Sequence, residues 1–374
     1  MLIKKKEIAL LLIFLSLVVT NLFAENYYFK RYDKENGLSQ QTVFCAVQDR
    51  RGFLWFGTKV GLNRFDGTKF KNYVADPEQP NSLPNNTVLA LAEAPDGSLW
   101  LETSDGLCIY NPEKDTFAPF VSADLTIEGL IDNLVFDKQG NLWVINSKGI
   151  YCLDVKNGNH KFFSASDFFV PTGITVTQSG SVWVLGLDGN IYLFNPQRME
   201  FSFYPILTKE EKTKHILLYR ILECSNGDLV VTTDRIGARR FSPNNGEVKV
   251  LFSNDSQNNP IYIHTAIQRN KDEFWFGTES GIHIYQLDLG FIDHLQKSYN
   301  DAYSLSDNAV HMLLKDREEG IWVGTFFGGV NYLSNNNTLF DKYLPKDEKG
   351  SIKANVIREI HPDVEGNLWV VMLF

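Results

Sequence analysis

This chain of 374 residues contains histidines, carboxylates and cysteines, but their spacing matches no known metal-binding or catalytic motif. Histidine is the commonest protein metal ligand, and seven histidines are spread over the sequence, at positions 160, 215, 264, 283, 294, 311 and 361. They form no spaced ligand pair, have no phospho-acceptor context, and are accompanied by no C-x-x-C motif. The sequence therefore predicts structural histidines, no metal site and no cofactor.

The positions of the carboxylates and of possible nucleophiles also indicate structural rather than catalytic roles. The sequence contains no G-x-S-x-G motif, no Walker loop and no G-x-G-x-x-G that opens a helix. Four aspartates begin turns such as "DRRGFLW" and "DKQGNLW", where aspartate accepts hydrogen bonds from the turn backbone. These turn residues are Asp49, Asp137, Asp316 and Asp363. We therefore predict no catalytic residues.

The four cysteines lie inside strand-like apolar runs such as "VFCAV" and "GLCIY", at positions 45, 108, 152 and 224. An even number of cysteines in an exported chain is compatible with disulfides. Since an unpaired cysteine behaves as a small buried hydrophobe, these settings favour four free, buried thiols.

The elements that position these residues follow from an internal repeat. The phrase "GFLWFGTKVGLNRFDG" at residues 52–67 returns as "EFWFGTESGIHIY" and "GIWVGTFFGGVNYL". The tryptophans recur every 40 to 47 residues, with one double gap in which Val230 takes the tryptophan position. They are Trp55, Trp100, Trp143, Trp183, Trp275, Trp322 and Trp369. Repetition in every unit favours packing between units over sugar stacking.

Each repeat contains four short strand-like runs separated by turn residues, which is the pattern of a propeller blade. The sequence predicts an all-β fold, a seven-bladed β-propeller of four-stranded antiparallel blades, over residues 25–355. Blades are expected to start near residues 42, 87, 130, 172, 217, 263 and 309. Within the frame, five glycines are expected to shape the strands and turns: Gly57, Gly61, Gly277, Gly281 and Gly324.

The two ends of the chain carry separate predictions. Lys4 to Lys6, an apolar run and Ala24 predict a secretory signal peptide over residues 1–24, with retention as an anchor left open. Residues 27–36 match the end of a unit and are expected to supply a closing outer strand. Residues 356–374 are expected to be the first strands of a further, incomplete propeller.

Ligand contacts are expected at turn positions whose residue differs from blade to blade while the surrounding repeat stays the same. Strands alternate in direction, so the turns between second and third strands share one end of the ring with the links between blades. Loops on a rigid scaffold commonly carry function. The candidates are Lys59, Asp105, Lys148, Asp188, Arg235, Glu279, Phe326 and Phe327. Arg235, Arg239 and Arg240 are candidates for an anionic sugar.

The phrases "ENGLSQQTVFCAVQDRRGFLWFGTKVGLNRFDGTKF" and "YSLSDNAVHMLLKDREEGIWVGTFFGGVNYL" resemble the two-component regulator propeller repeats of hybrid two-component sensors from Bacteroides-like bacteria. The resemblance extends over residues 27–374, and units three to five depart from it most. It implies the periplasmic, glycan-sensing region of such a sensor, which regulates polysaccharide utilisation.

The functional expectation is therefore a non-enzymatic periplasmic sensor propeller. The expected partners are an oligosaccharide ligand and a second copy of the chain joined through propeller faces. A net charge of −9 gives no electrostatic basis for binding nucleic acid, and no membrane span is expected after the signal peptide. A stand-alone scaffold for protein interaction and a propeller lyase or hydrolase remain alternatives.

Overall fold

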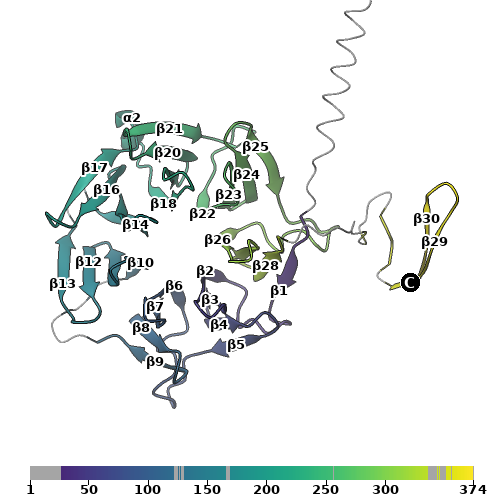
Figure 1. Ribbon diagram of the computed structural model, residues 1–374, viewed down its shortest axis with the longest axis horizontal. Helices are drawn as coiled ribbons and strands as arrows, with labels where there is room; N and C mark the ends of the chain where they lie inside the picture. Colours follow the sequence, from purple (N-terminus) through teal and green to yellow (C-terminus); the bar gives the residue numbers. More distant parts are fainter. Residues whose placement is uncertain are drawn as a thin grey trace, which may run out of the picture.

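The computed structural model describes residues 27–121, 125, 127, 130–165, 169–255, 257–335, 343, 345, 351–354 and 356–373. The expected signal peptide lies outside the described residues. Within the described part of the chain, strands form seven four-stranded antiparallel sheets and one two-stranded sheet. The seven sheets stand around a common axis (Figure 1), which confirms the predicted seven-bladed β-propeller.

Each blade extends from an innermost strand at the axis to an outermost strand at the rim (Figure 1). The innermost strands of blades 1 to 7 are β2 (Val43–Gln48), β6 (Val88–Glu93), β10 (Ile131–Phe136), β14 (Pro171–Val176), β18 (Leu218–Glu223), β22 (Ile263–Gln268) and β26 (Val310–Lys315). The second strands are β3 (Leu54–Thr58), β7 (Leu99–Thr103), β11 (Asn141–Asn146), β15 (Val182–Gly186), β19 (Leu229–Thr233), β23 (Glu273–Thr278) and β27 (Ile321–Thr325). The third strands are β4 (Gly61–Phe65), β8 (Gly106–Asn111), β12 (Gly149–Asp154), β16 (Asn190–Asn195), β20 (Ala238–Ser242), β24 (Gly281–Gln286) and β28 (Val330–Leu333). The outermost strands are β5 (Phe70–Tyr73), β9 (Thr116–Pro119), β13 (His160–Ser164), β17 (Glu200–Pro205), β21 (Glu247–Phe252), β25 (Gly290–Leu295) and, for blade 7, β1 (Lys30–Tyr32).

Blade 7 takes its outermost strand from the beginning of the described chain. β1 pairs antiparallel with β28, and Tyr32 stacks on Trp322 with ring centroids 5.7 Å apart. The Arg31 guanidinium also donates a hydrogen bond to the carbonyl of Ser304 at 2.9 Å. A strand from the start of the ring thus completes the last blade and covers the edge that blade would otherwise expose.

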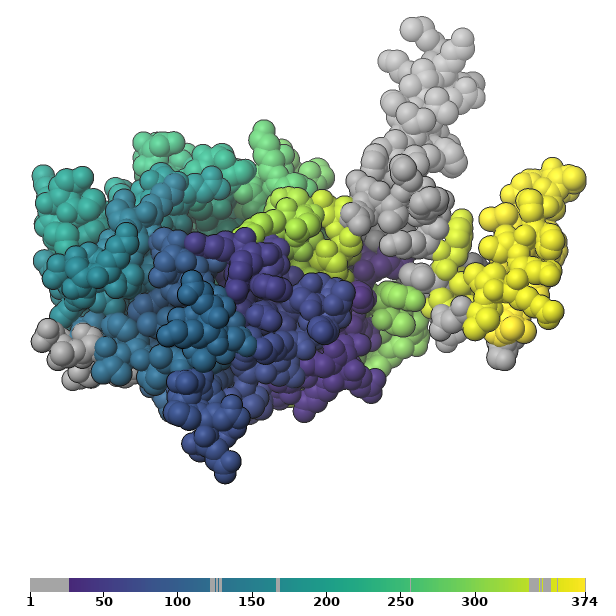
Figure 2. Space-filling view, turned by 60° about the horizontal axis from the view of Figure 1, so that its bottom comes forward, coloured from purple at the N-terminus to yellow at the C-terminus, as the bar shows by residue number. Residues whose placement is uncertain are grey.

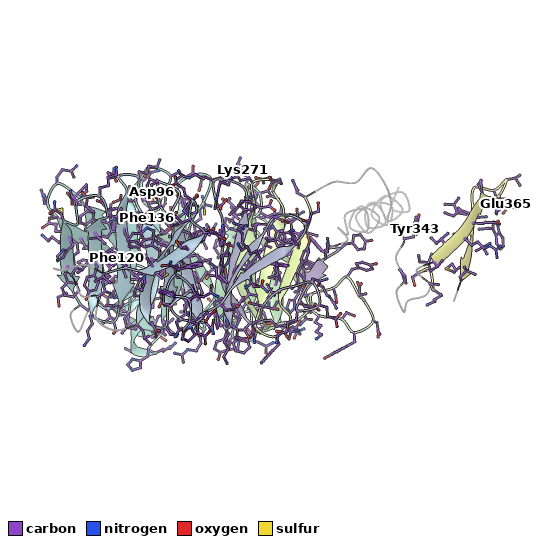
Figure 3. The ribbon with its side chains drawn as sticks, turned by 90° about the horizontal axis from the view of Figure 1, so that it is seen from below. Asp96, Phe120, Phe136, Lys271, Tyr343 and Glu365 are labelled. Carbon is purple, nitrogen blue, oxygen red and sulfur yellow. The ribbon has the colours of Figure 1, made fainter. Side chains whose placement is uncertain are left out.

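The repeated aspartate builds the turn between the first and second strands. In blade 1, Asp49 Oδ1 accepts hydrogen bonds from the backbone N–H groups of Arg51 and Phe53. Its Oδ2 accepts the indole Nε1–H of Trp55 at 2.9 Å, and blades 3 and 7 repeat this bond. Viewed edge-on (Figure 3), Asp96 and Lys271 show the corresponding turns of blades 2 and 6 at one end of the ring. The aspartates therefore fix a turn and orient a tryptophan.

The tryptophans of the second strands lie in the hydrophobic contacts between blades. Among the described residues, buried apolar side chains form seven clusters, each drawn from two adjacent blades. Six clusters contain a tryptophan that is at most 4% exposed, and the seventh contains Val230. One wedge of apolar side chains is thus repeated around the ring.

Trp369 does not share this burial. It lies in a hairpin of β29 (Val356–Pro362) and β30 (Leu368–Leu373), to the side of the ring (Figures 1 and 2). Its indole Nε1 donates to Asp363 at 3.0 Å, as in a blade, yet its side chain is 66% exposed. The expected packing role is therefore wrong for Trp369, because no described sheet covers this hairpin. That the hairpin begins a further propeller stays a prediction.

Helical structure is minor in the described residues. α2 (Lys209–Thr213) lies in the link between blades 4 and 5, where Thr208 and Glu211 form a capping box. No helix in the described ranges has the length and apolar character needed to cross a membrane.

Candidate functional site

The turns between second and third strands form the end of the ring opposite to the aspartate turns; we call it the variable face. Its turn tips are residues 59–60, 104–105, 147–148, 187–188, 234–235, 279–280 and 326–327. The links between blades lie at the same end. For example, the amide of Lys59 donates to the carbonyl of Thr42, and the amide of Phe326 donates to that of Ala309.

The five predicted glycines have two kinds of surroundings. Gly61 and Gly281, which end turns of the variable face, have φ values of 95° and 113°, which glycine adopts without steric cost. Gly57, Gly277 and Gly324 lie in second strands, where the next blade approaches closely. A Cβ added at Gly57 would lie 2.8 Å from the carbonyl oxygen of that blade's Val88.

The eight predicted ligand residues are distributed around the variable face. Six are exposed, and Asp188 and Phe326 are partly buried. The exposed ones are Lys59, Asp105, Lys148, Arg235, Glu279 and Phe327. Asp188 accepts a hydrogen bond from the Tyr192 hydroxyl at 2.7 Å, and Arg235 binds the His215 carbonyl, so both also stabilise local structure.

Two of the three arginines proposed for an anionic sugar are engaged inside blade 5. Arg239 is 1% exposed and forms an ion pair with Glu211 from α2. Arg240, which is partly exposed, forms an ion pair with Asp228, the residue directly before β19. The prediction is therefore wrong for Arg239, because its guanidinium is buried and already paired; for the partly exposed Arg240 it stays a prediction.

Every innermost strand also presents a residue that the sequence analysis did not single out. After the first residue of each strand the register with the second strand shifts, so one extra residue forms a bulge at the variable-face end. The bulge residues are Phe44, Leu89, Asp132, Thr172, Tyr219, His264 and His311. Each is partly or fully exposed, whereas the residue before it is buried. Bulges re-aim side chains and are common beside functional sites.

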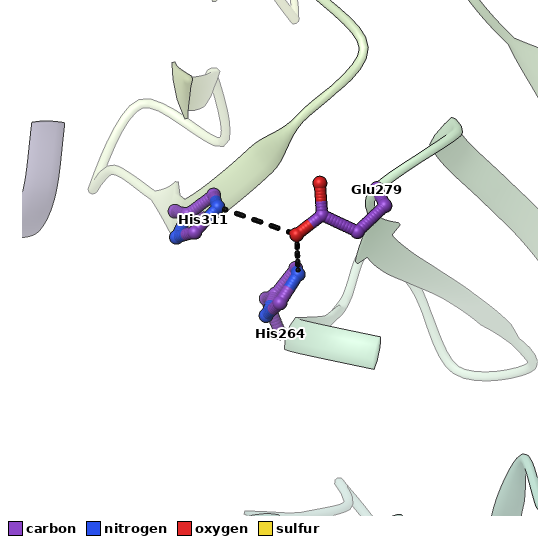
Figure 4. A group of neighbouring side chains, drawn as sticks. All are labelled: His264, Glu279 and His311. Atoms are coloured by element: carbon purple, nitrogen blue, oxygen red, sulfur yellow. Dashed lines mark hydrogen bonds and ion pairs between the residues drawn. The ribbon is translucent and has the colours of Figure 1, made fainter. Parts of the chain in front are cut away.

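Three consecutive bulge residues lie side by side, and two of them contact side chains from the turn tips. The ring of His264 stacks on that of His311, with centroids 4.4 Å apart, and its other neighbour is Tyr219 at 6.0 Å. Glu279 Oε1 lies 2.6 Å from His264 Nε2 and 3.8 Å from His311 Nε2 (Figure 4). Phe326 packs against His311 at 5.3 Å. The structure thus joins Glu279 and Phe326 through two histidines that were predicted to be structural.

The electrostatic surroundings of His311 are mixed. Burial lowers the pKa of His311, and nearby His264 and Arg220 lower it as well, whereas the carboxylates of Glu279 and Asp307 oppose that shift. Arg220 Nε also donates to the His264 carbonyl at 3.0 Å, which fixes the backbone at the bulge. Around neutral pH, His311 is therefore predominantly the uncharged imidazole.

A second titratable group lies in blade 2, where Glu102 occupies the position that Gly57 holds in blade 1. Its side chain is 1% exposed, and its Oε1 has no hydrogen-bond partner among the described residues. Burial, assisted by the charge of Asp132, raises the pKa of Glu102 to about 8. Glu102 is therefore mostly protonated at pH 7, next to the bulge residue of blade 3.

The cysteines do not contribute nucleophiles to this surface. All four are unpaired, as predicted. Burial raises the pKa of the Cys108, Cys152 and Cys224 thiols to about 12, and burial raises that of Cys45 as well. Their thiolates are therefore scarce at neutral pH.

Comparisons with known proteins agree with this architecture. Residues 37–59 and 304–327 match the two component regulator propeller family. Over 58 residues the chain is 47% identical to Histidine kinase P4 of Formosa agariphila, which covers 16% of this chain and 4% of that protein.

Solved structures extend the likeness to the whole ring. The extracellular domain of a protein described as a hybrid two component system of B. thetaiotaomicron matches with a TM-score of 0.72 and 25% identity, over 92% of this chain and 47% of that domain. A second such domain, described as part of a one component system, matches at 0.71 and 18%, over 93% and 52%. The chain spans about half the length of these domains.

Propeller enzymes share the fold at greater distance. Virginiamycin B lyase from Staphylococcus aureus has a TM-score of 0.63 and 12% identity, over 83% of this chain and 99% of the lyase, which is a likeness of fold alone. The family match is to a regulator propeller, and the structures with higher TM-scores are described as extracellular domains of a hybrid two component and a one component system. The chain thus forms a seven-bladed ring similar to these extracellular domains, and two of its repeats match the two component regulator propeller family.

Proposed function

We propose that this chain is a non-enzymatic, exported sensor propeller that binds an oligosaccharide at the centre of its variable face. The observation that carries the proposal is the set of bulge residues, in which seven equivalent positions around the axis hold six different residue types. A repeated scaffold of strands whose side chains differ at one end of the ring suits a recognition surface.

The chemistry of these positions supports a sugar ligand. Tyr219 is 37% exposed and Phe327 is 68% exposed, so both rings are accessible to the apolar face of a sugar. Asp132, His264 and Glu279 add hydrogen-bonding groups for hydroxyls. The likeness to the extracellular domain of a hybrid two component system supports an exported sensor. We further propose a periplasmic location, glycan fragments as the signal and polysaccharide utilisation as the regulated process, as the resemblance of the repeats implies.

Calorimetric titration of the purified full chain with neutral and acidic oligosaccharides tests the proposal. We expect saturable binding, and no change in the sugar after prolonged incubation. Tyr219→Ala should weaken the Kd by about 10-fold, because it removes an exposed aromatic platform worth roughly 1.4 kcal/mol.

The matched control is Phe203→Ala, which removes another exposed aromatic ring, from the outermost strand β17. It should leave the Kd unchanged. Release of a shorter or unsaturated sugar would instead identify a hydrolase or lyase. Self-association without binding of any glycan would favour an interaction scaffold, and either result contradicts the proposal.

A further inference from the structure

We infer that His264, Glu279 and His311 form a binding site for a divalent transition metal, with Zn²⁺ as the ion that fits best. Their donor atoms, two imidazole nitrogens and one carboxylate oxygen, all lie within 4.8 Å of one another. Two histidines and one carboxylate are an established ligand set for zinc in proteins. The sequence concealed the set because the three residues come from three separate segments of two blades.

The three donors differ in position and exposure: the two histidines lie on strands, whereas the glutamate lies at an exposed turn tip. His264 and His311 sit at equivalent bulges of β22 and β26, which are neighbouring innermost strands. Their imidazole planes are 14° from parallel, so both Nε2 atoms can face Glu279 (Figure 4). Glu279 comes from a turn tip, and its side chain is 56% exposed. The exposed Glu279 side chain can therefore turn toward an ion that is bound by the two histidines.

The distances require only a small adjustment. Donors bound to one tetrahedral Zn²⁺ at 2.0–2.2 Å are separated by about 3.3 Å. Glu279 Oε1 lies 2.6 Å from His264 Nε2 and 3.8 Å from His311 Nε2, on either side of that value. Movement of the Glu279 carboxylate away from His264 and toward His311 would bring both separations nearer to this value.

The local charge also favours a cation. The carboxylates of Glu279 and Asp307 and the guanidinium of Arg220 all act on His311. Of these groups, the two carboxylates favour a bound cation and the guanidinium opposes it. Nitrogen donors select borderline ions such as Zn²⁺ over Mg²⁺ and Ca²⁺, which prefer a full set of oxygen ligands.

Three protein ligands leave the fourth tetrahedral position for water or a ligand oxygen. Because Glu279 belongs to the variable face, that position lies at the proposed sugar site. We therefore expect Zn²⁺ to strengthen oligosaccharide binding; this last step rests on the proposed function, whereas the metal site does not.

The test is calorimetric titration of the full chain, freed of metal with a chelator, with Zn²⁺ at pH 7 and without sugar. We expect one equivalent to bind with a micromolar or lower Kd, and Mg²⁺ and Ca²⁺ to bind at least 100-fold more weakly. His264→Ala, His311→Ala and Glu279→Gln should each weaken Zn²⁺ binding at least 10-fold. Co²⁺ should give the visible absorption of a four-coordinate site, and each variant should lose it.

His160→Ala is the matched control, because it removes an exposed histidine from β13 in blade 3. It should bind Zn²⁺ like the parent chain. Circular dichroism separates loss of ligand from loss of fold, and Glu279→Gln keeps the read-out available if a histidine variant unfolds. Zn²⁺ binding that survives all three variants, or equal affinity for Mg²⁺, would overturn the site. Zn²⁺ binding without any effect on sugar affinity would overturn only the coupling.

Discussion

Replacing Trp55 with alanine is expected to lower the free energy of unfolding by about 3–5 kcal/mol, the usual cost of truncating a large buried aromatic. Trp55 is fully buried between blades 1 and 2, where its ring contacts Tyr73 and Tyr110 with centroids 5.7 and 4.8 Å apart. The substitution leaves a cavity between two blades. It also removes the indole N–H that donates a hydrogen bond to Asp49. Urea unfolding followed by intrinsic fluorescence and circular dichroism measures the change.

Trp369→Ala is the matched control, because Trp369 belongs to the same Asp-to-Trp motif but its ring is not buried between blades. Trp369 also donates its indole N–H to the aspartate six residues earlier, yet it is 66% exposed. Its loss should cost less than about 1 kcal/mol. Equal costs for the two substitutions would mean that the local indole–aspartate bond, and not packing between blades, stabilises the repeat. If Trp55→Ala does not fold, Trp55→Phe should still show a measurable loss.

Replacing Glu102 with glutamine is expected to make the protein more stable in alkaline solution by about 1–3 kcal/mol, because glutamine keeps the shape of the side chain but cannot become a buried, unpaired charge. The pKa of Glu102 is raised to about 8 in the fold, above its ordinary value of 4.5. Between these two values the folded state keeps a proton that the unfolded state has lost. The stability contributed by this group therefore falls as pH rises from about 4.5 to about 8, and it is constant above that range.

The measurement is the difference in unfolding free energy between the parent chain and Glu102→Gln, at pH 5 and at pH 9. The difference should be small at pH 5 and should favour the variant at pH 9. Asp105→Asn, which removes an exposed carboxylate from the neighbouring turn, should show no such dependence. A difference that is the same at both pH values would mean that Glu102 is ionised in the folded ring.

Glu102 and the two bulge histidines, which are titratable groups, all occupy positions defined by the repeated blade structure. A glycine of the second strand lets the next blade approach, and blade 2 has Glu102 in that place. The bulges of the innermost strands bring six different residue types to the axis. The bulge position varies because the ring needs its backbone geometry rather than a particular side chain. Function can therefore be placed there without loss of the fold.

The fold itself could be read from the sequence because its determinants are local and repeated. A turn aspartate, a tryptophan six residues later and a glycine that ends the next turn occur within one unit, and the period of the units gives the number of blades. Hydrogen bonds such as that from Trp55 to Asp49 close within a few residues. Even the closing strand was visible, because β1 retains the pattern of a unit's end.

Tertiary structure decided what the sequence pattern could not. Whether a tryptophan is buried depends on a neighbouring sheet, which separates Trp55 from Trp369 despite their identical local bonds. The guanidinium of Arg239 is buried through its ion pair with Glu211, which lies 28 residues earlier in α2. His264, Glu279 and His311 meet because two bulges re-aim their residues and two blades stand side by side. The register of the bulges and the contacts between blades bring together residues of separate repeats. Such long-range contacts produce no recurring pattern in the sequence, so they could not be predicted from it.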